Sequence, residues 1–410
     1  MSEQTLHQVE FNTFDDEFTA DPYPEYARLR ASGRALQNEL GIWMLPHYED
    51  ATALLRHPNV SSDPLKSEVF ATLFQTFLGG QDGPGIRLVK NLLLLMDPPD
   101  HTRMRALANA AFSRKAVEDW RPEIKRITDE LLDALVERDE ADLMAEFAYP
   151  LPVTVIAELL GVPLSDRENF TSWGRELIEM FSFSLEEFTP ERTERGNNAV
   201  MSFNDYFEGL SNERRRQPRD DLLTALVEAE AEGERLSHEE LLATCLLLLI
   251  AGHETTANLI GNGTVALLRN PQALARLRDD PSVTSSAIEE LLRYDSPVQM
   301  TARTTLEPIE VAGVEIPANA RVASMLGSSN RDEGHFDRAD ELVLDRSSAP
   351  HVSFGGGIHF CLGAPLARIE ARVAFPALLQ RARNLELATD ELDWRKTFPF
   401  RGLRSLPVRV

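Results

Sequence analysis

The stretch Phe354-Gly355-Gly356-Gly357-Ile358-His359-Phe360-Cys361-Leu362-Gly363 places one cysteine between a glycine-rich turn and a predicted helix over residues 362–379. Glycine reaches positive φ without a steric penalty, so this turn can bring its backbone close to a flat ligand. A cysteine at a helix start faces donor N–H groups and the positive end of the dipole, which favours the thiolate. Such a thiolate is a metal ligand or a nucleophile. From the short motif alone, a buried and inert cysteine is an equally good interpretation.

The motif extends beyond the cysteine. The run satisfies every fixed position of the pattern Phe-Gly-x-Gly-x-His-x-Cys-x-Gly, and Leu366-Ala367-Arg368-Ile369-Glu370 continues it. This combination resembles the haem-binding loop of the cytochromes P450. The resemblance implies that Cys361 is the axial thiolate of the iron of haem b, a ligand that pushes electron density onto iron. It also implies that His359 bonds a haem propionate, that Phe354 packs near the sulfur, and that Gly355 and Gly363 border the cofactor.

The composition is that of a globular protein with a large core. The chain has 410 residues, of which 43% are hydrophobic and 26% charged. A net charge of −24 argues against nucleic acid and anionic membrane surfaces as partners. We see no apolar run of membrane-spanning length and no signal peptide, so we expect a cytoplasmic monomer. The two cysteines, Cys245 and Cys361, form neither a disulfide framework nor a paired-cysteine zinc pattern.

Phenylalanines recur at helical spacing in residues 69–78, where Phe70, Phe74 and Phe77 share one face. Periodicity alone favours a helix that turns this face to the core. The matching region of the P450 family covers the substrate pocket, so the resemblance implies that these three phenylalanines line that pocket. Their apolar rings suit a lipophilic substrate. The resemblance implies the same role for four later residues, Phe181, Val298, Met300 and Phe398.

His101 and Arg105 lie four residues apart after Asp97-Pro98-Pro99-Asp100, a stretch that predicts a helix start. The two side chains therefore share one helix face. A solvated surface pair is the ordinary interpretation of such spacing. The segment also resembles the P450 segment whose histidine and arginine bind haem propionates, and two cations facing a dianion make electrostatic sense. By the same resemblance, Arg303 binds a propionate.

A long helix is predicted from Ser237, which forms a capping box with Glu240, to residue 270, a length of about 50 Å. Its middle reads Ala251-Gly252-His253-Glu254-Thr255-Thr256, which places polar residues after two leucine-rich turns. Either the helix surfaces there, or it forms a kinked groove. The stretch resembles the oxygen-activation motif of the P450 family. The resemblance implies that Thr255 and Glu254 deliver protons and that Ala251 borders the haem.

Glu290 and Arg293 lie three apart and can pair on one helix face, a spacing too common to carry meaning alone. Their position after the long helix resembles that of the buried Glu-x-x-Arg pair of the P450 family, which has a structural role. In that family a second arginine from a later loop joins the pair, and Arg346 stands at the matching position. Full mutual pairing is expected, because an orphaned buried charge is strongly destabilising.

The resemblance runs from residue 21 to 406 and implies a cytochrome P450 fold, mainly α with a small β-rich region, as one domain over residues 1–410. It implies a haem-thiolate monooxygenase that inserts one atom of O2 into a lipophilic small molecule. Electrons would come from NAD(P)H through ferredoxin reductase and ferredoxin. A peroxygenase is less favoured, because Glu254-Thr255 is present. A haem protein that binds ligand without turnover is the third interpretation.

A docking site for ferredoxin is expected despite the acidic chain. Arg103, Arg114, Lys115 and Arg368 belong to segments near the face over the cysteine, where the family docks its partner. Screening beyond about 10 Å lets a local patch outweigh the overall charge. The alternative is that Arg103 and Arg114 pair with neighbouring acids such as Asp100 and Glu118.

Overall fold

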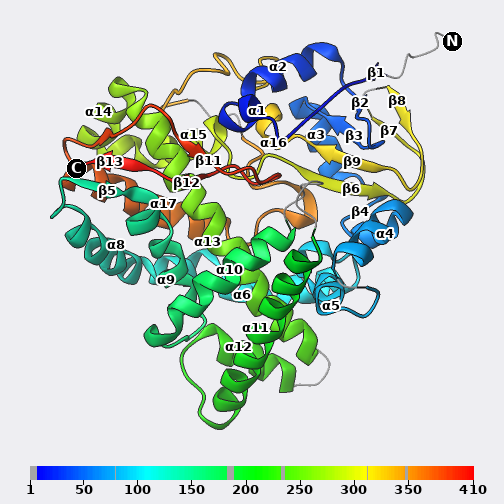
Figure 1. Cartoon of the computed structure of the whole chain (residues 1–410), viewed down its shortest axis with the longest axis horizontal. Helices are drawn as coiled ribbons and strands as arrows, with labels where there is room; N and C mark the ends of the chain where they lie inside the picture. Colours follow the sequence, from blue (N-terminus) through cyan, green and yellow to red (C-terminus); the bar gives the residue numbers. More distant parts are fainter. Residues whose placement is uncertain (1–6, 79, 182–188, 232–235, 312, 347–349) are drawn as a thin grey trace.

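The computed structural model describes residues 7–78, 80–181, 189–231, 236–311, 313–346 and 350–410. Helices fill most of the molecule, which is broad where the sheets lie and narrows toward α11 and α12 (Figure 1). The predicted class, mainly α with a small β-rich region, is confirmed. The α-helices are α1 (Asp16–Ala20), α2 (Tyr23–Ser32), α3 (Tyr48–Arg56), α4 (Glu68–Phe77), α5 (Pro84–Asn91), α6 (Asp100–Ala111), α7 (Arg114–Asp119), α8 (Arg121–Leu135), α9 (Pro150–Leu159), α10 (Arg167–Phe181), α11 (Pro190–Arg216), α12 (Leu222–Ala231), α13 (His238–Leu268), α14 (Pro271–Asp279), α15 (Thr284–Tyr294), α16 (Leu326–Ser329) and α17 (Ala364–Arg381).

Helix α13 crosses the centre of the helical region (Figure 1). The predicted capping box is present, because the Ser237 hydroxyl accepts from the Glu240 N–H while the Glu240 carboxylate accepts from the Ser237 N–H. By length and composition this helix could cross a membrane, but 72% of its most apolar window is buried within the protein. That burial is typical of the core helix of a globular protein.

Thirteen strands form four sheets among the described residues. Two hairpins turn at glycines with positive φ: β2 pairs with β3 near Gly41, and β7 pairs with β8 near Gly313. The largest sheet has the order β1-β2-β3-β9-β6-β4. The strands are β1 (His7–Gln8), β2 (Leu36–Gln37), β3 (Trp43–Leu45), β4 (Val60–Ser61), β5 (Glu140–Asp142), β6 (Thr301–Thr305), β7 (Ile309–Val311), β8 (Val314–Ile316), β9 (Arg321–Ser324), β10 (Glu386–Leu387), β11 (Asp393–Trp394), β12 (Leu403–Ser405) and β13 (Pro407–Arg409).

The buried charges of α15 anchor the segment that leads to the cysteine loop. Arg293 is 1% exposed and donates to Glu290 through Nε and Nη2, both at 2.8 Å. Arg346 donates to the same carboxylate, with Nε 3.0 Å from Oε2. Arg293 Nη1 also donates to the carbonyl of Asn330, whose side-chain amide bonds Ser353 beside the loop. The three charged residues are therefore mutually paired as expected.

Candidate active site

Two glycines of the cysteine loop have positive φ, where residues with a side chain are strained. Gly355 and Gly357 have φ of +67° and +65°. A Cβ on Gly357 would lie 2.2 Å from the Leu55 carbonyl oxygen, so α3 packs directly on the loop backbone. The Cys361 N–H donates to the Phe354 carbonyl at 2.9 Å. Helix α17 begins at Ala364, two residues later than predicted, with Gly363 as its N-cap.

The two cysteines lie in different environments. Burial raises the pKa of the Cys361 thiol, and the N–H groups of Gly363 and Ala364 and the charge of Arg105 oppose that rise. Cys245 is fully buried in the apolar core, which raises the pKa of its thiol strongly with no opposing cation. Only Cys361 therefore has donors and a positive charge directed at its sulfur, as a thiolate ligand requires.

Four cationic or cation-forming side chains converge beside this loop from three parts of the chain. His101 comes from α6, Arg303 from β6 and His359 from the loop itself, and the two imidazole centroids are 4.2 Å apart. Arg105 of α6 donates to the Phe360 carbonyl at 2.6 Å, which ties this helix to the loop. The predicted cofactor contacts are thus brought together around Cys361.

These side chains lack the anion that their burial requires. The Nε2 atoms of His101 and His359 are buried without a hydrogen-bond partner. Arg303 is 7% exposed and donates only to Thr301 Oγ1 and the Ala302 carbonyl, with no ion pair to any residue that the structure describes. Burial and the neighbouring Arg303 lower the pKa of His359 to about 3, and burial lowers the pKa of Arg303 to about 10. A ligand with two carboxylates would satisfy all of these donors.

The middle of α13 has one open side although the helix is otherwise buried. Ala251 is exposed and Thr255 half-buried, whereas Leu249, Thr256 and Ala257 are buried. The Thr255 hydroxyl donates to the Ala251 carbonyl at 2.7 Å. Buried residues lie on both sides of this stripe in the sequence, so only one side of the helix is open at Ala251 and Thr255.

Glu254 faces a partner that the sequence did not reveal. Its carboxylate is 3% exposed, and Oε1 accepts from Arg395 Nη1 at 2.7 Å. The Arg395 guanidinium lies 4.9 Å from the centroid of the Tyr149 ring. The Asn258 amide donates to the same oxygen at 3.4 Å. Glu254 is therefore held by an ion pair to the C-terminal segment, and none of its described hydrogen bonds goes to Thr255.

The predicted pocket phenylalanines of α4, Phe70, Phe74 and Phe77, are all half-buried. None of the residues of α4 is fully buried, so this face turns inward but stays at the margin of the core. Phe74 packs at the margin of the main apolar core, and the Phe70 ring lies 5.4 Å from the Arg321 guanidinium carbon. The side chain of Phe181 lies outside the described residues.

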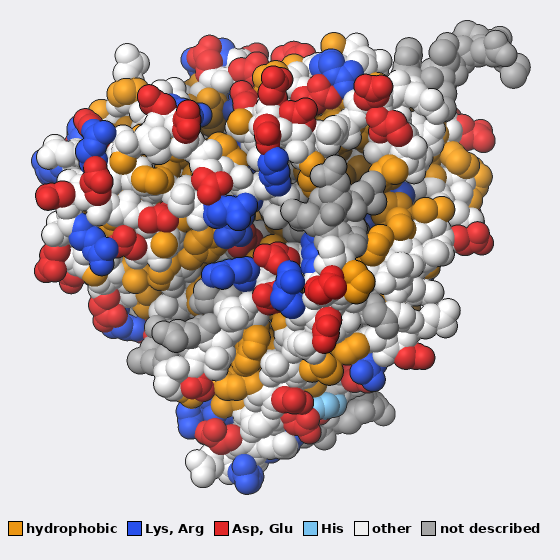
Figure 2. Space-filling model, viewed as in Figure 1, with side chains coloured by type: hydrophobic (Ala, Val, Ile, Leu, Met, Phe, Trp, Pro, Cys, Tyr) orange, Lys and Arg blue, Asp and Glu red, His pale blue; other side chains and the backbone are white. Residues whose placement is uncertain are grey.

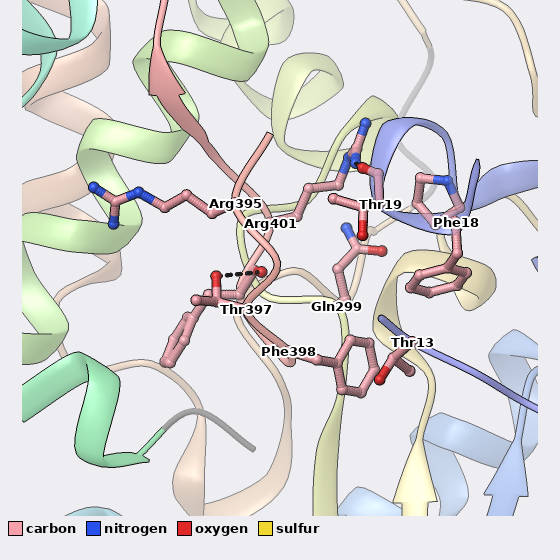
Figure 3. A pocket seen from close by; sticks show the side chains of 10 residues that line it. Thr13, Phe18, Thr19, Gln299, Arg395, Thr397, Phe398 and Arg401 are labelled. Carbon is pink, nitrogen blue, oxygen red and sulfur yellow. Dashed lines mark hydrogen bonds between the residues drawn. The ribbon is translucent and has the colours of Figure 1, made fainter. Parts of the chain in front are cut away.

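The other pocket predictions fall near the N-terminal segment. Phe398 lies 6.2 Å, centroid to centroid, from both Phe11 and Phe18, and Met300 packs in the same apolar cluster. Figure 3 shows Phe398 and Phe18 beside a cavity of about 20 Å³, room for about one water. Val298 pairs with Phe400 in an isolated bridge. The sequence did not reveal that residues 11–18 pack here.

The expected basic patch is only partly present. Arg103 pairs with Glu240 and Asp100, and Arg368 donates to both oxygens of Glu289 at 2.8 and 2.7 Å. The alternative that Arg103 pairs with a neighbouring acid is therefore confirmed, and the charge of Arg368 is also paired. Arg114 and Lys115 are exposed at the start of α7 and form no ion pair with the described part of the chain. On the face drawn in Figure 2, acidic and basic side chains are interspersed.

Together, a helical fold, a thiol in an electropositive loop and unpaired buried cations define a protein that holds a planar dianionic metal cofactor. The cytochrome P450 family model matches residues 42–397. Cytochrome P450 107B1 of Saccharopolyspora erythraea is 43% identical, covering 97% of this chain and 96% of its own. The monooxygenase PikC of Streptomyces venezuelae is 40% identical, covering 98% and 94%. The structure of the myxobacterial cytochrome P450 CYP267B1 with myristic acid has a TM-score of 0.87 at 41% identity, covering 97% and 98%.

The chain belongs to the cytochrome P450 family, and it is a monooxygenase whose cofactor is haem b. The orphaned histidine nitrogens, the unpaired Arg303 and the cysteine with donors at its sulfur fit that cofactor.

Proposed function

We propose that this enzyme inserts one oxygen atom of O2 into a lipophilic small molecule, with electrons delivered by a ferredoxin and its NAD(P)H-dependent reductase. In this proposal Cys361 ligates the haem iron, and His101, Arg105, Arg303 and His359 bind the propionates. Thiolate-ligated haem supplies the activation of O2. The observation that carries the proposal is a set of buried groups around the cysteine loop that have no anion: Nε2 of His101, Nε2 of His359 and the guanidinium of Arg303.

Thr255 and Glu254 have separate tasks in this proposal. The Thr255 hydroxyl lies on the open stripe of α13 and would hold a proton at Oγ1 for delivery to the reacting group. Ala251, one turn earlier, leaves room next to it. Glu254 is paired with Arg395 and would reach the stripe only after that ion pair opens. Once released, its carboxylate would take a proton from solvent and pass it to the Thr255 hydroxyl.

The substrate is proposed to be lipophilic, since α4 directs three phenylalanines away from full burial. Relatives support this class. The vitamin D(3) 25-hydroxylase of Pseudonocardia autotrophica is 39% identical, and the 6-deoxyerythronolide B hydroxylase of Saccharopolyspora erythraea is 38% identical. Ferredoxin would dock over the cysteine loop, where Arg114 and Lys115 remain free to meet an acidic partner.

The experiment compares Cys361→Ser with Cys245→Ser in the haem-loaded protein. Reduced parent protein with CO is expected to show the red-shifted Soret band of thiolate-ligated haem. Cys361→Ser should abolish that band, and Cys245→Ser should keep it, because Cys245 is fully buried in the apolar core. Loss of the band in Cys245→Ser with its retention in Cys361→Ser would refute the assignment.

A further inference from the structure

Arg321 is a cation that the haem site does not account for. It begins β9 and pairs with Thr304 of β6, while Arg303 pairs with Val322. Neighbouring residues of a strand point to opposite faces of the sheet, and paired residues share a face. Arg303 and Arg321 therefore project from opposite faces, and Arg321 lies on the side where Phe70 of α4 covers it.

Arg321 has few partners for a charged side chain in this position. Its Nη1 donates to Thr304 Oγ1 at 3.0 Å, and no carboxylate among the described residues forms an ion pair with it. Burial and repulsion by Arg303 lower the pKa of Arg321 to about 10, and Asp63 only partly offsets this, so the group is charged at neutral pH. The Arg321 side chain is half-buried, so part of it remains accessible.

Two buried arginines elsewhere in this fold pair with acids. Arg214 bonds Asp221 at 2.6 Å, and Arg401 bonds Asp295 at 2.9 Å. Arg303, which lacks an acid of its own, meets its counter-ion when haem binds. By the same reasoning Arg321 marks the place of a second anion, because an uncompensated charge at such a site is costly.

An apolar path leads away from this cation. Phe70, Phe74 and Phe77 follow one face of α4, and seven residues of helix span about 10 Å. Phe70 touches the guanidinium at one end of that face. A cation at the end of an apolar stripe matches an amphiphile with an anionic head and a hydrocarbon chain.

We propose that Arg321 binds the carboxylate of the substrate, and that the hydrocarbon chain of a lipophilic acid lies along the phenylalanine face of α4. This substrate class rests on the proposed monooxygenase function. The planar guanidinium can donate two parallel hydrogen bonds to a carboxylate, which an alcohol of equal chain length cannot accept in the same way.

The test measures binding of decanoic acid and 1-decanol to the haem-loaded enzyme by calorimetry and by the substrate-induced shift of the ferric Soret band. The parent should bind the acid more tightly than the alcohol. Arg321→Gln should weaken acid binding about 10- to 100-fold, the range for a hydrogen bond to a charged group, and leave alcohol binding nearly unchanged. Arg321→Lys should recover part of the preference, and Arg87→Gln, at an exposed arginine of α5, should leave it intact.

Three outcomes would overturn the inference: no preference for the acid in the parent, equal losses for acid and alcohol in Arg321→Gln, or loss of haem from that variant. The last outcome would assign Arg321 to the cofactor. Failure of the proposed function would be seen separately, as absence of the thiolate band in the CO complex of the parent.

Discussion

The ion pair between Glu254 and Arg395 makes a prediction that can be worked out from its surroundings. Arg395→Gln removes the cation and leaves Glu254 3% exposed, with the Asn258 amide at 3.4 Å and His253 Nε2 at 3.9 Å from its oxygens. Burial lowers the pKa of His253, so this imidazole stays neutral and does not replace the lost charge. The variant therefore retains a poorly solvated carboxylate.

The expected loss of unfolding free energy in Arg395→Gln follows from the geometry of the pair. A hydrogen bond to a charged group contributes about 1.5–3 kcal/mol to stability. The Arg395 side chain is 22% exposed, so water reaches the gap. We therefore expect a loss in the lower part of that range, about 2 kcal/mol. Glu254→Gln should cost about 1 kcal/mol, because the freed guanidinium rehydrates and Gln still accepts a hydrogen bond. The double variant should resemble Glu254→Gln, which gives a clear coupling energy.

Urea unfolding of the four haem-loaded proteins, followed by circular dichroism, measures this cycle. An additive cycle would refute the pairing.

Two further predictions follow from other charges. Burial raises the pKa of Glu370 from its ordinary value of 4.5 to about 8, and one of its carboxyl oxygens has no partner. The stability of the protein should therefore fall as pH rises from 4.5 toward 8, and Glu370→Gln should flatten that fall in urea unfolding at different pH values. The double variant Arg114→Glu with Lys115→Glu should slow the reduction of the enzyme by ferredoxin and weaken the salt dependence of that rate, without changing substrate binding. The control Arg87→Glu, on α5, should leave the reduction rate unchanged. An unchanged rate for the double variant in stopped-flow measurements would place the docking site elsewhere.

Contiguous motifs were predictable because their chemistry is local. The capping box at Ser237 and the turn at Gly357 each depend on residues a few positions apart, and the structure places them as expected. The triad of Glu290, Arg293 and Arg346 was also predictable, although only the family resemblance linked its third member. Charge burial then explains why all three must meet.

Contacts between distant segments could not be predicted in this way. Arg395 lies 141 residues from Glu254, and nothing in its own neighbourhood indicates an acid across the fold. Arg368 was expected at a free basic surface, yet Glu289 of α15 reaches it from 79 residues away. A charge pattern read along the chain counts cations, but only the packing of helices decides which of them are already neutralised.

That distinction gives the unpaired cations their meaning. Arg214, Arg293 and Arg401 show that this chain supplies an acid where a buried guanidinium serves only the fold. Acidic residues could also have stood beside Arg303 and Arg321, because both arginines lie in paired strands where a neighbouring residue could be Asp or Glu. Such acids would neutralise the charges, but they would also repel an incoming carboxylate. The missing acids are therefore consistent with ligand binding at both positions, with haem propionates on one face of the sheet and a substrate carboxylate on the other.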